Sequence, residues 1–524
     1  MKKKLFLFGS LGLFACFQNC AQVANNSIQF SSDVPLCVDL NPDAFAPKVK
    51  WDWYKLLDKS SSDTYPNISQ VMAAPMVADL NADGAPEVVF VSWSTTVKDS
   101  YRGAGVLRIV DGRTGQTLKS IGDDNLAPYA STSPLLIDID GDGKVEIFYS
   151  HYSGTSVVAL NSDGTLRWKH SVPDLPTDKT LKNQTGFSAF DIDGDGKAEI
   201  LIGQWAISED SAKKPFQKWK AQAWVSPASA FAINLDASRP NQVRIVASNG
   251  VYDLDGDLVF TLPNSRYSAG DIDGTPGLEL VGTGGGYLRI ADGVTGNIKL
   301  DKDLSVHNEL RCPLGIGGGP STLGDFDGNP QTSEIALATG RYLTIFDGSG
   351  SLIAKYATQD CSSLVTGISS FDFNGDGKPE ILYGDEEYLR VFEIVNGELR
   401  VVWSTVNPSG TLNEYPVVAD VDGNGSSELL VISNNYNVKS FYKDPNETAD
   451  AEIAKSITGL RVFEPVVSGT WMPTRNIWNS FDYNPAFVTD KGRAVSSTSL
   501  ESFTAKLFRR NAQLGMFERR CVQR

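Results

Sequence analysis

Acidic side chains recur at a fixed spacing in this sequence of 524 residues, and that spacing suits a divalent metal ion. In the phrase DIDGDGKVEI, Asp138, Asp140 and Asp142 occupy positions 1, 3 and 5, and Glu146 occupies position 9. Carboxylates at alternate positions can converge on one ion if the backbone wraps around it, and a glycine at position 6 permits the bend. Ca²⁺ takes about 6–8 oxygen ligands, so the phrase predicts a calcium-binding loop.

The phrase occurs at seven places, and five copies keep every ligand position. The ligand residues of these five copies are Asp79, Asn81, Asp83 and Glu87; Asp138, Asp140, Asp142 and Glu146; Asp191, Asp193, Asp195 and Glu199; Asp372, Asn374, Asp376 and Glu380; and Asp420, Asp422, Asn424 and Glu428. Two damaged copies depart from the pattern. In one, Thr275-Pro276 replaces Asp-Gly, which leaves Asp271, Asp273 and Glu279. In the other, the glutamate comes one residue late, and the set is Asp325, Asp327, Asn329 and Glu334. We therefore expect about five Ca²⁺ sites and leave the two damaged loops open.

The alternative interpretation of each copy is a plain β-turn, because Asp, Asn and Gly favour turns without any metal. Residues 253–257, DLDGD, fit that alternative because no acid follows at position 9. An EF-hand does not fit, since its loop closes with a glutamate at position 12 that leads into a helix. Repetition of complete ligand sets favours metal loops.

Short apolar runs flank each loop, which predicts β-hairpins, and each unit contains four short strands. The first aspartates of the seven loops are separated by 47 to 80 residues, the repeat length of a β-propeller blade. The sequence therefore predicts an all-β fold, a seven-bladed β-propeller. An additional strand at residues 48–54 is expected to complete the last blade and to leave no open edge.

These loops, together with the glycine-rich residues 315–319 before the fifth loop, resemble FG-GAP/VCBS repeats, the calcium-binding blades of integrin-α-type propellers. The resemblance covers residues 47–480 and is specific for the fold. It implies that the loop residues of the five intact units bind Ca²⁺ on one face. It also implies that partners are met on the other face, and that the protein resembles propellers of bacterial cell surfaces.

The longest interval, between Asp191 and Asp271, predicts an insertion at about residues 205–245. Trp205, Trp219 and Trp224 lie there among lysines, and aromatic rings beside cations form a candidate ligand surface. The alternative is that the tryptophans pack against neighbouring blades and that the lysines are solvated.

The chain after the last loop carries another insertion and a distinctive motif. The insertion is expected near residues 436–457. Residues 471–479, WMPTRNIWN, resemble a segment that trails such propellers, and Arg475 with the two tryptophans is expected to seal the closing blade. Residues 481–524 are expected to form a tail packed on or trailing the propeller, most helix-like at 503–515.

The first residues predict export. Residues 1–20 combine three lysines with an apolar stretch, as in a signal peptide, and residues 21–46 resemble a polar linker. LFAC at Cys16 resembles a lipobox, Cys20 is a rival lipidation site, and simple cleavage is the alternative. We expect an outer-membrane lipoprotein or cell-surface protein, with periplasmic or secreted forms as alternatives.

Four other cysteines allow two disulfides in an exported protein. Cys312 and Cys361 lie at nearly equivalent points of consecutive repeats, which predicts a bridge between them. Cys37 and Cys521 would then tie the ends of the chain.

The sequence offers no catalytic motif. Its three histidines, His151, His170 and His307, lie in different units without metal-ligand spacing, and no nucleophile elbow or phosphate loop is present. The net charge of −16 gives no support for nucleic-acid binding. We expect a non-enzymatic, monomeric protein that acts in adhesion by binding a protein or glycan, and that meets a membrane only through a lipid anchor. The alternative is a polysaccharide-active lyase or hydrolase.

Overall fold

The computed structural model describes residues 45–57, 63–95, 100–172, 186–221, 230–236, 238–239, 242–275, 277–310, 312–436, 450, 453–495 and 508–513. All of them belong to one compact unit, Val34–Arg524. The signal peptide, Cys16, Cys20, Cys37, Trp224, Cys521 and most of the second insertion lie outside these ranges. No helix within them is long and apolar enough to cross a membrane.

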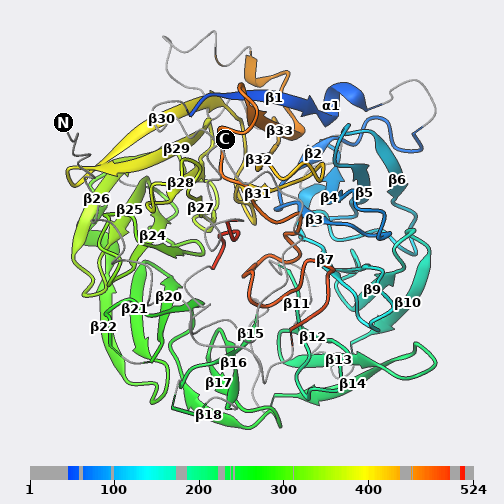
Figure 1. The fold of residues 1–524 in the computed structure, drawn as a ribbon, viewed down its shortest axis with the longest axis horizontal. Coiled ribbons are helices and arrows are strands. Elements are labelled where there is room, and N and C mark those ends of the chain that lie inside the picture. Colours follow the sequence, from blue (N-terminus) through cyan, green and yellow to red (C-terminus); the bar gives the residue numbers. More distant parts are fainter. Residues whose placement is uncertain are drawn as a thin grey trace, which may run out of the picture. The chain divides into compact units, whose positions relative to one another are not determined.

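Eight antiparallel sheets form a ring, with the first strand of each sheet toward the centre and the fourth at the rim (Figure 1). The first four blades comprise β2 (Gln70–Val71), β3 (Met76–Ala78), β4 (Glu87–Trp93), β5 (Val106–Asp111) and β6 (Thr117–Ile121); β7 (Leu135–Ile137), β8 (Glu146–Ser150), β9 (Ser156–Leu160) and β10 (Leu166–Ser171); β11 (Ser188–Phe190), β12 (Glu199–Ile202), β13 (Trp205–Glu209) and β14 (Pro215–Lys220); and β15 (Phe231–Asn234), β16 (Val243–Ala247), β17 (Gly250–Tyr252) and β18 (Leu258–Thr261).

The other four blades comprise β19 (Arg266–Gly270), β20 (Glu279–Gly284), β21 (Tyr287–Asp292) and β22 (Ile298–Asp303); β23 (Thr322–Gly324), β24 (Glu334–Thr339), β25 (Tyr342–Phe346) and β26 (Leu352–Ala357); β27 (Ser369–Phe371), β28 (Glu380–Gly384), β29 (Tyr388–Val395) and β30 (Glu398–Val406); and β31 (Val417–Ala419), β32 (Glu428–Ser433), β33 (Gly459–Pro465) and β1 (Pro47–Asp52). Three short helical turns, α1 (Trp53–Leu56), η1 (Ser100–Arg102) and η2 (Leu304–His307), lie in connections.

The prediction of seven blades is wrong, because blade 4 has no acidic loop by which to count it. Its strands β15 to β18 lie within the long interval between Asp191 and Asp271. The expected insertion at residues 205–245 is instead the second half of blade 3 followed by the first half of blade 4. Residues 253–257 form the turn between β17 and β18, where Gly256 N donates to Asp253 O at 3.2 Å, as the sequence predicted for a metal-free turn.

The N-terminal strand closes the ring. β1 pairs antiparallel with β33, from Pro47 opposite Pro465 to Asp52 opposite Arg461, and so completes blade 8, as the sequence predicted. The indole of the buried Trp51 then donates to Gly112 O of blade 1 at 2.8 Å. One strand therefore fastens the two ends of the ring to each other.

A disulfide joins Cys312 to Cys361, with their Cα atoms 5.6 Å apart, as predicted. Cys312 lies in the connection from blade 5 to blade 6, and Cys361 in the connection from blade 6 to blade 7. The bridge therefore links two successive connections between blades on the face opposite the acidic loops.

The described C-terminal residues occupy the centre of the ring, where Figure 1 shows the orange-to-red segments. Trp478 pairs with Val77 of β3, Arg493 with Asp138 next to β7, and Arg510 with Ser370 of β27. Residues 508–513 form turns and isolated bridges, not the expected helix. Trp471, Arg475 and Trp478 are buried, so the WMPTRNIWN motif contributes to this central plug.

Replacement of Arg475 by alanine is expected to lower stability by about 3–5 kcal/mol, since a buried, fully bonded cation is removed. Its guanidinium donates to Val488 O at 2.7 Å and Pro485 O at 2.8 Å, and it also pairs with the carboxylate of Asp490. Thermal and denaturant unfolding would measure the loss.

Arg239→Ala is the matched control, because this arginine is exposed and its guanidinium contacts Asp236 and Gln242, each three residues away. A change below about 0.5 kcal/mol is expected there. Equal losses in both variants would contradict a structural role for the central plug.

Candidate metal centres

The seven acidic loops connect the first and second strands of seven blades. Successive turns of an antiparallel blade alternate between the two faces of the ring, so all seven loops lie on one face. The loops follow β3, β7, β11, β19, β23, β27 and β31, and blade 4 alone among the blades carries none. The predicted ligand sets are thus distributed around one rim.

Backbone N–H groups shape each loop around its aspartates. In blade 2, Asp138 accepts from Gly141 N at 2.7 Å and from Gly143 N at 3.0 Å. Both glycines have positive φ, 76° and 88°, which L side chains rarely adopt. Ala82 takes the place of the first of these glycines in blade 1 and still adopts φ 63°. The loop conformation is therefore retained even where the favourable residue is missing.

The glutamate of every loop is buried and makes the same hydrogen bond. Its Oε2 accepts from the backbone N–H of the residue after the first aspartate, at 2.7 to 3.2 Å in all seven loops. Glu334 of blade 6 makes this bond to Phe326 N at 2.7 Å although it arrives one residue late in the sequence. The glutamate thus closes the base of the loop.

Carboxylate oxygens converge in five loops, where the first aspartate, the third-position aspartate and the glutamate each place one oxygen within 4.8 Å of the others. These are the loops of blades 2, 3, 5, 6 and 8. In blades 1 and 7 the third position is Asn81 or Asn374. The amide Nδ2 of each donates to the glutamate Oε1, at 3.3 Å and 3.0 Å.

Burial and like charges raise the pKa values of the glutamates. Burial, with nearby aspartates adding to it, raises the pKa of Glu87 to about 7 and of Glu380 to about 8. Burial likewise raises the pKa of Glu334 to about 7 and of Glu428 to about 9. Each shift reports a carboxylate that is costly to ionise, and for Glu428 the cost of burial outweighs the attraction of Lys50, 3.6 Å away.

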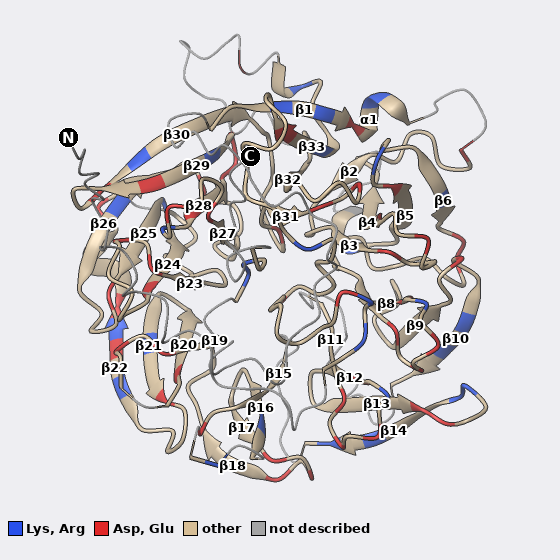
Figure 2. Cartoon of the chain, viewed as in Figure 1, with Lys and Arg blue, Asp and Glu red and all other residues tan. Residues whose placement is uncertain are grey.

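Side-chain cations reach four of the loops from the outermost strand of the same blade, which is β10, β14, β22 or β1. Figure 2 marks lysine and arginine positions in these outer strands in blue. Lys218 Nζ lies 2.6 Å from Asp193 and 2.7 Å from Glu199 in blade 3, and Lys299 Nζ lies 3.1 Å from Asp273 and 2.7 Å from Glu279 in blade 5. In blade 8 the same place is taken by a lysine from β1.

That lysine, Lys50, lies 2.6 Å from Asp422, 2.9 Å from Glu464 and 3.6 Å from Glu428. Burial disfavours its charge, but these acids raise the pKa of Lys50 above its ordinary value. The strand that closes the ring thus also brings a cation to the last loop.

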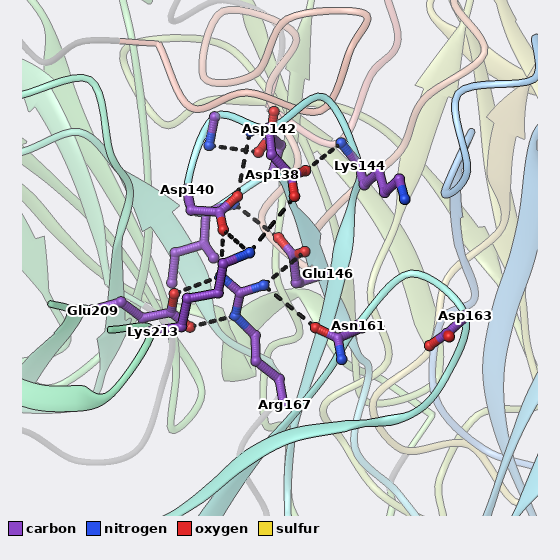
Figure 3. Close-up of polar contacts among 12 residues, drawn as sticks. Asp138, Asp140, Asp142, Lys144, Glu146, Asn161, Asp163, Arg167, Glu209 and Lys213 are labelled. Atoms are coloured by element: carbon purple, nitrogen blue, oxygen red, sulfur yellow. Dashed lines mark hydrogen bonds and ion pairs between the residues drawn. The ribbon is translucent and has the colours of Figure 1, made fainter. Parts of the chain in front are cut away.

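Blade 2 carries the largest number of cations (Figure 3). Arg167 lies 2.7 Å from Asp140 and 3.1 Å from Glu146, and Lys213, from the β13–β14 turn of blade 3, lies 2.5 Å from Asp140. Although burial opposes it, bonding to Lys213 and Arg167 lowers the pKa of Asp140 to about 2. Arg493 of the central plug also lies 3.2 Å from Asp138.

The donor sets of blades 1, 6 and 7 fit a hard divalent cation. Each offers two aspartates and an asparagine on one short loop. Among the described residues no lysine or arginine forms an ion pair with these aspartates, although Arg510 interacts electrostatically with Asp325 and Asp372. Carboxylate and amide oxygens are the ligands that Ca²⁺ prefers. In blades 2, 3, 5 and 8 a side-chain cation already contacts the carboxylates.

Sequence reasoning missed these cations and misread the lysines near Trp205. Trp205 and Trp219 are buried, with 1% and 8% of their surface exposed, so they do not form the predicted ligand surface. Lys213 and Lys218 neutralise loop carboxylates. The available signal was a lysine or arginine in the fourth strand of a blade, but only the fold shows that it faces the loop.

A cavity of about 180 Å³ opens on the face opposite the loops. Its lining comes from connections between blades 1, 6, 7 and 8, and comprises Met72, Tyr101, Arg102, Ser362, Ser363, Gly410, Thr411, Leu412 and Tyr436. Tyr101 and Tyr436 lie 6.1 Å apart, both pack against the buried Trp93, and Arg102 lies 5.2 Å over the ring of Tyr101. Aromatic rings, hydroxyls and a guanidinium therefore line this cavity.

The ring and its acidic hairpin loops define a β-propeller. The family model of the FG-GAP-like repeat matches residues 138–202 and 372–431, each running from one acidic loop to the second strand of the next blade. The chain is therefore an FG-GAP-repeat β-propeller protein.

Solved structures support the same fold. The V. cholerae biofilm matrix protein Bap1 is 19% identical, with a TM-score of 0.67 over 89% of this chain and 98% of that one. The exotype rhamnogalacturonan lyase YesX is 16% identical, with a TM-score of 0.51 over 75% of this chain and 72% of that one. The Bacillus licheniformis rhamnogalacturonan lyase PL11 is 14% identical, with a TM-score of 0.52 over 85% and 79%. A comparison with curated protein sequences finds no match.

Chelated protein is expected to lose stability as the pH rises from about 5 to about 8. The folded-state pKa values of Glu87, Glu334 and Glu380 lie above the ordinary value of 4.5, at about 7, 7 and 8. Such groups stabilise the fold fully below their unfolded pKa, and this contribution is lost as the pH rises through the folded one. Thermal unfolding in EDTA at pH 5.5, 7 and 8.5 would measure the slope.

Glu380→Gln should flatten that slope, whereas Glu398→Gln, an exposed site in the same blade, should leave it unchanged. A slope of the opposite sign in the chelated wild type would refute the assignment of ionisation cost to the loops.

Proposed function

We propose that this protein is a calcium-stabilised β-propeller that acts in adhesion by binding a glycan in the cavity opposite its acidic loops. The observation that supports it best is the separation of the two features. The acidic loops occupy one face, and the cavity opens on the other. A metal that holds the loops would then leave the binding face free.

Calcium is the ion that the loops favour. Their donors are carboxylate, amide and carbonyl oxygens on a short flexible loop, with no sulfur or imidazole among the positions of the motif. Ca²⁺ accepts such irregular oxygen sets, whereas Mg²⁺ demands near-octahedral geometry and keeps its waters. Buried glutamates of raised pKa give the ion an electrostatic role as well, because it offsets their charge.

The cavity favours a sugar over a charged macromolecule. Tyr101 and Tyr436 line the cavity, and aromatic rings can stack against sugar rings through the C–H groups of the sugar. Ser362, Ser363 and Thr411 supply hydroxyls for hydrogen bonds. Only one lining residue, Arg102, is charged, so the ligand is proposed to be a neutral or weakly acidic glycan.

The proposal includes export, which would bring this cavity to glycan ligands outside the cell. The lysines and apolar stretch of residues 1–20 support export, and the proposal includes exposure at the cell surface through a lipid on Cys16 or Cys20. The disulfide between Cys312 and Cys361 agrees with an oxidising compartment.

The polysaccharide-active enzyme is kept as the second candidate. The fold is shared with two rhamnogalacturonan lyases, and buried acids lie behind the cavity wall: burial raises the pKa of Glu386 to about 7 and of Glu414 to about 8. No carboxylate or imidazole belongs to the cavity lining itself. Incubation with neutral and acidic glycans, followed by assay for new reducing or unsaturated ends, discriminates the two candidates.

Chelation is expected to lower the unfolding temperature, and Ca²⁺ is expected to restore it. Each occupied site contributes about 2.7 kcal/mol when free Ca²⁺ is 100 times its dissociation constant. Differential scanning calorimetry in EDTA, in Ca²⁺ and in Mg²⁺ would measure the shift. An identical transition in EDTA and in Ca²⁺ would end the calcium part of the proposal.

Tyr101→Ala and Tyr436→Ala are expected to weaken glycan binding at least about tenfold, since a stacked aromatic contributes on the order of 1 kcal/mol or more. Titration of the best glycan from an array would measure the affinity. Tyr287→Ala is the matched control, because Tyr287 also lies beside an arginine, Arg289, but in blade 5. An array that retained only protein ligands, or equal losses in all three variants, would contradict the glycan assignment.

A further inference from the structure

We propose that the seven acidic loops belong to two classes, in which a side-chain cation replaces the metal in blades 2, 3, 5 and 8, and a divalent cation is needed only in blades 1, 6 and 7. This inference rests on the proposed calcium binding and specifies where it occurs. It differs from the five sites expected from the sequence, because it removes three intact loops and adds one damaged loop.

A β-bulge in the fourth strand sets the position of the replacing cation. In every blade one residue of the outermost strand is left without a partner where the register shifts. The unpaired residues of blades 1 to 8 are Leu118, Arg167, Lys218, Val259, Lys299, Ile353, Val402 and Lys50. A bulge re-aims its side chain, and the four charged bulge residues contact the acidic loop of their blade.

The chemical type of the bulge residue divides the loops. It is a cation in blades 2, 3, 5 and 8, and each of these cations pairs with both the third-position aspartate and the glutamate of its loop. It is apolar in blades 1, 6 and 7, and in blade 4, which has no acidic loop. Charged bulge residues therefore occur only in blades whose loop carries carboxylates.

The third loop position varies together with the bulge. All four loops with a bulge cation have aspartate there, whereas two of the three loops without one have asparagine, Asn81 and Asn374. These amides donate to the glutamate Oε1, the atom that the cations of blades 3 and 5 contact at 2.7 Å. In blade 6 the hydroxyl of Thr332 lies 3.4 Å from Oε1 of Glu334. Three glutamates thus accept at Oε1 from a charged donor and three from a neutral one. Glu428 Oε1 has no hydrogen-bond donor but lies 3.6 Å from Lys50 Nζ.

A bound ammonium or guanidinium does two things to a loop. It offsets the mutual repulsion of the carboxylates, as a bound metal ion would. It also repels a second cation at the same carboxylates. The blade 2 loop, which matches the metal motif best, receives three cations: Arg167, Lys213 and Arg493. In blades 1, 6 and 7 the side chains that donate to the glutamate are neutral. Arg510 of the central plug interacts electrostatically with Asp325, Asp372 and Glu380 but forms no ion pair with them, so the remaining repulsion in those loops is compensated by the metal.

Hydrogen–deuterium exchange of the full-length protein with and without Ca²⁺ resolves the loops separately. EDTA is expected to accelerate exchange at least about tenfold in residues 79–87, 325–334 and 372–380, where a tenfold change corresponds to about 1.4 kcal/mol of local stability. Exchange in residues 138–146, 191–199, 271–279 and 420–428 is expected to stay unchanged.

Reciprocal substitutions test the bulge residue directly. Lys218→Met should make residues 191–199 sensitive to EDTA, whereas Lys214→Met, which removes an exposed lysine of the same hairpin, should not. Leu118, with 57% of its surface exposed, tolerates replacement. Leu118→Lys should therefore make residues 79–87 insensitive to EDTA, and Leu118→Met should leave them sensitive.

The outcomes separate this inference from the proposed function. Protection by Ca²⁺ in all seven loops, or substitutions without effect, would overturn the two classes and leave calcium binding intact. Protection in none of the loops would overturn both. Equilibrium dialysis with ⁴⁵Ca²⁺ gives an independent measure. About three bound ions are expected per chain, one in each of the three loops without a bulge cation.

Discussion

The structure depends on one repeated bond, from the buried glutamate of each loop to the backbone N–H after the first aspartate. It recurs in seven blades at 2.7 to 3.2 Å. The bond joins the second strand to the start of the loop and so fixes how the hairpin leaves the sheet. The bond holds the glutamate carboxylate away from water and beside two or more aspartates, which makes its ionisation unfavourable. The remaining features of this face serve to compensate that charge.

Compensation explains why the outermost strands differ among blades that are otherwise alike. A fourth strand with a lysine or arginine at its bulge supplies the counter-charge from within the blade. Lys50 does so from β1, so the strand that closes the ring also neutralises the last loop. Lys213 and Arg493 do so from a neighbouring blade and from the central plug. Ring closure, blade contact and loop charge are therefore coupled.

The sequence predicted the features that local patterns encode. Four-stranded units, loops between first and second strands, closure by β1 and the Cys312–Cys361 bridge all follow from spacing and alternation, and the structure has them. The predicted number of blades was wrong because the blades were counted by their acidic motifs, and blade 4 has no such motif. For Trp205 and Trp219 the sequence left a ligand surface and packing between blades as alternatives, because a single strand does not reveal burial, and the structure shows both side chains buried. The bulge cations were invisible because their partners lie about 20 or more residues away in the chain, and in blade 8 more than 370.

The two faces of the ring differ in how much the chain can vary them. Loops on the acidic face are tied by backbone hydrogen bonds to their own aspartates, so a change there affects the closure of a hairpin. The other face is built from the connections between blades and from the hairpins between second and third strands, and its cavity draws residues from several of these. Connections of that kind tolerate substitution better than strands do. Residues of the proposed binding cavity can therefore change while the charge balance on the acidic face remains the same.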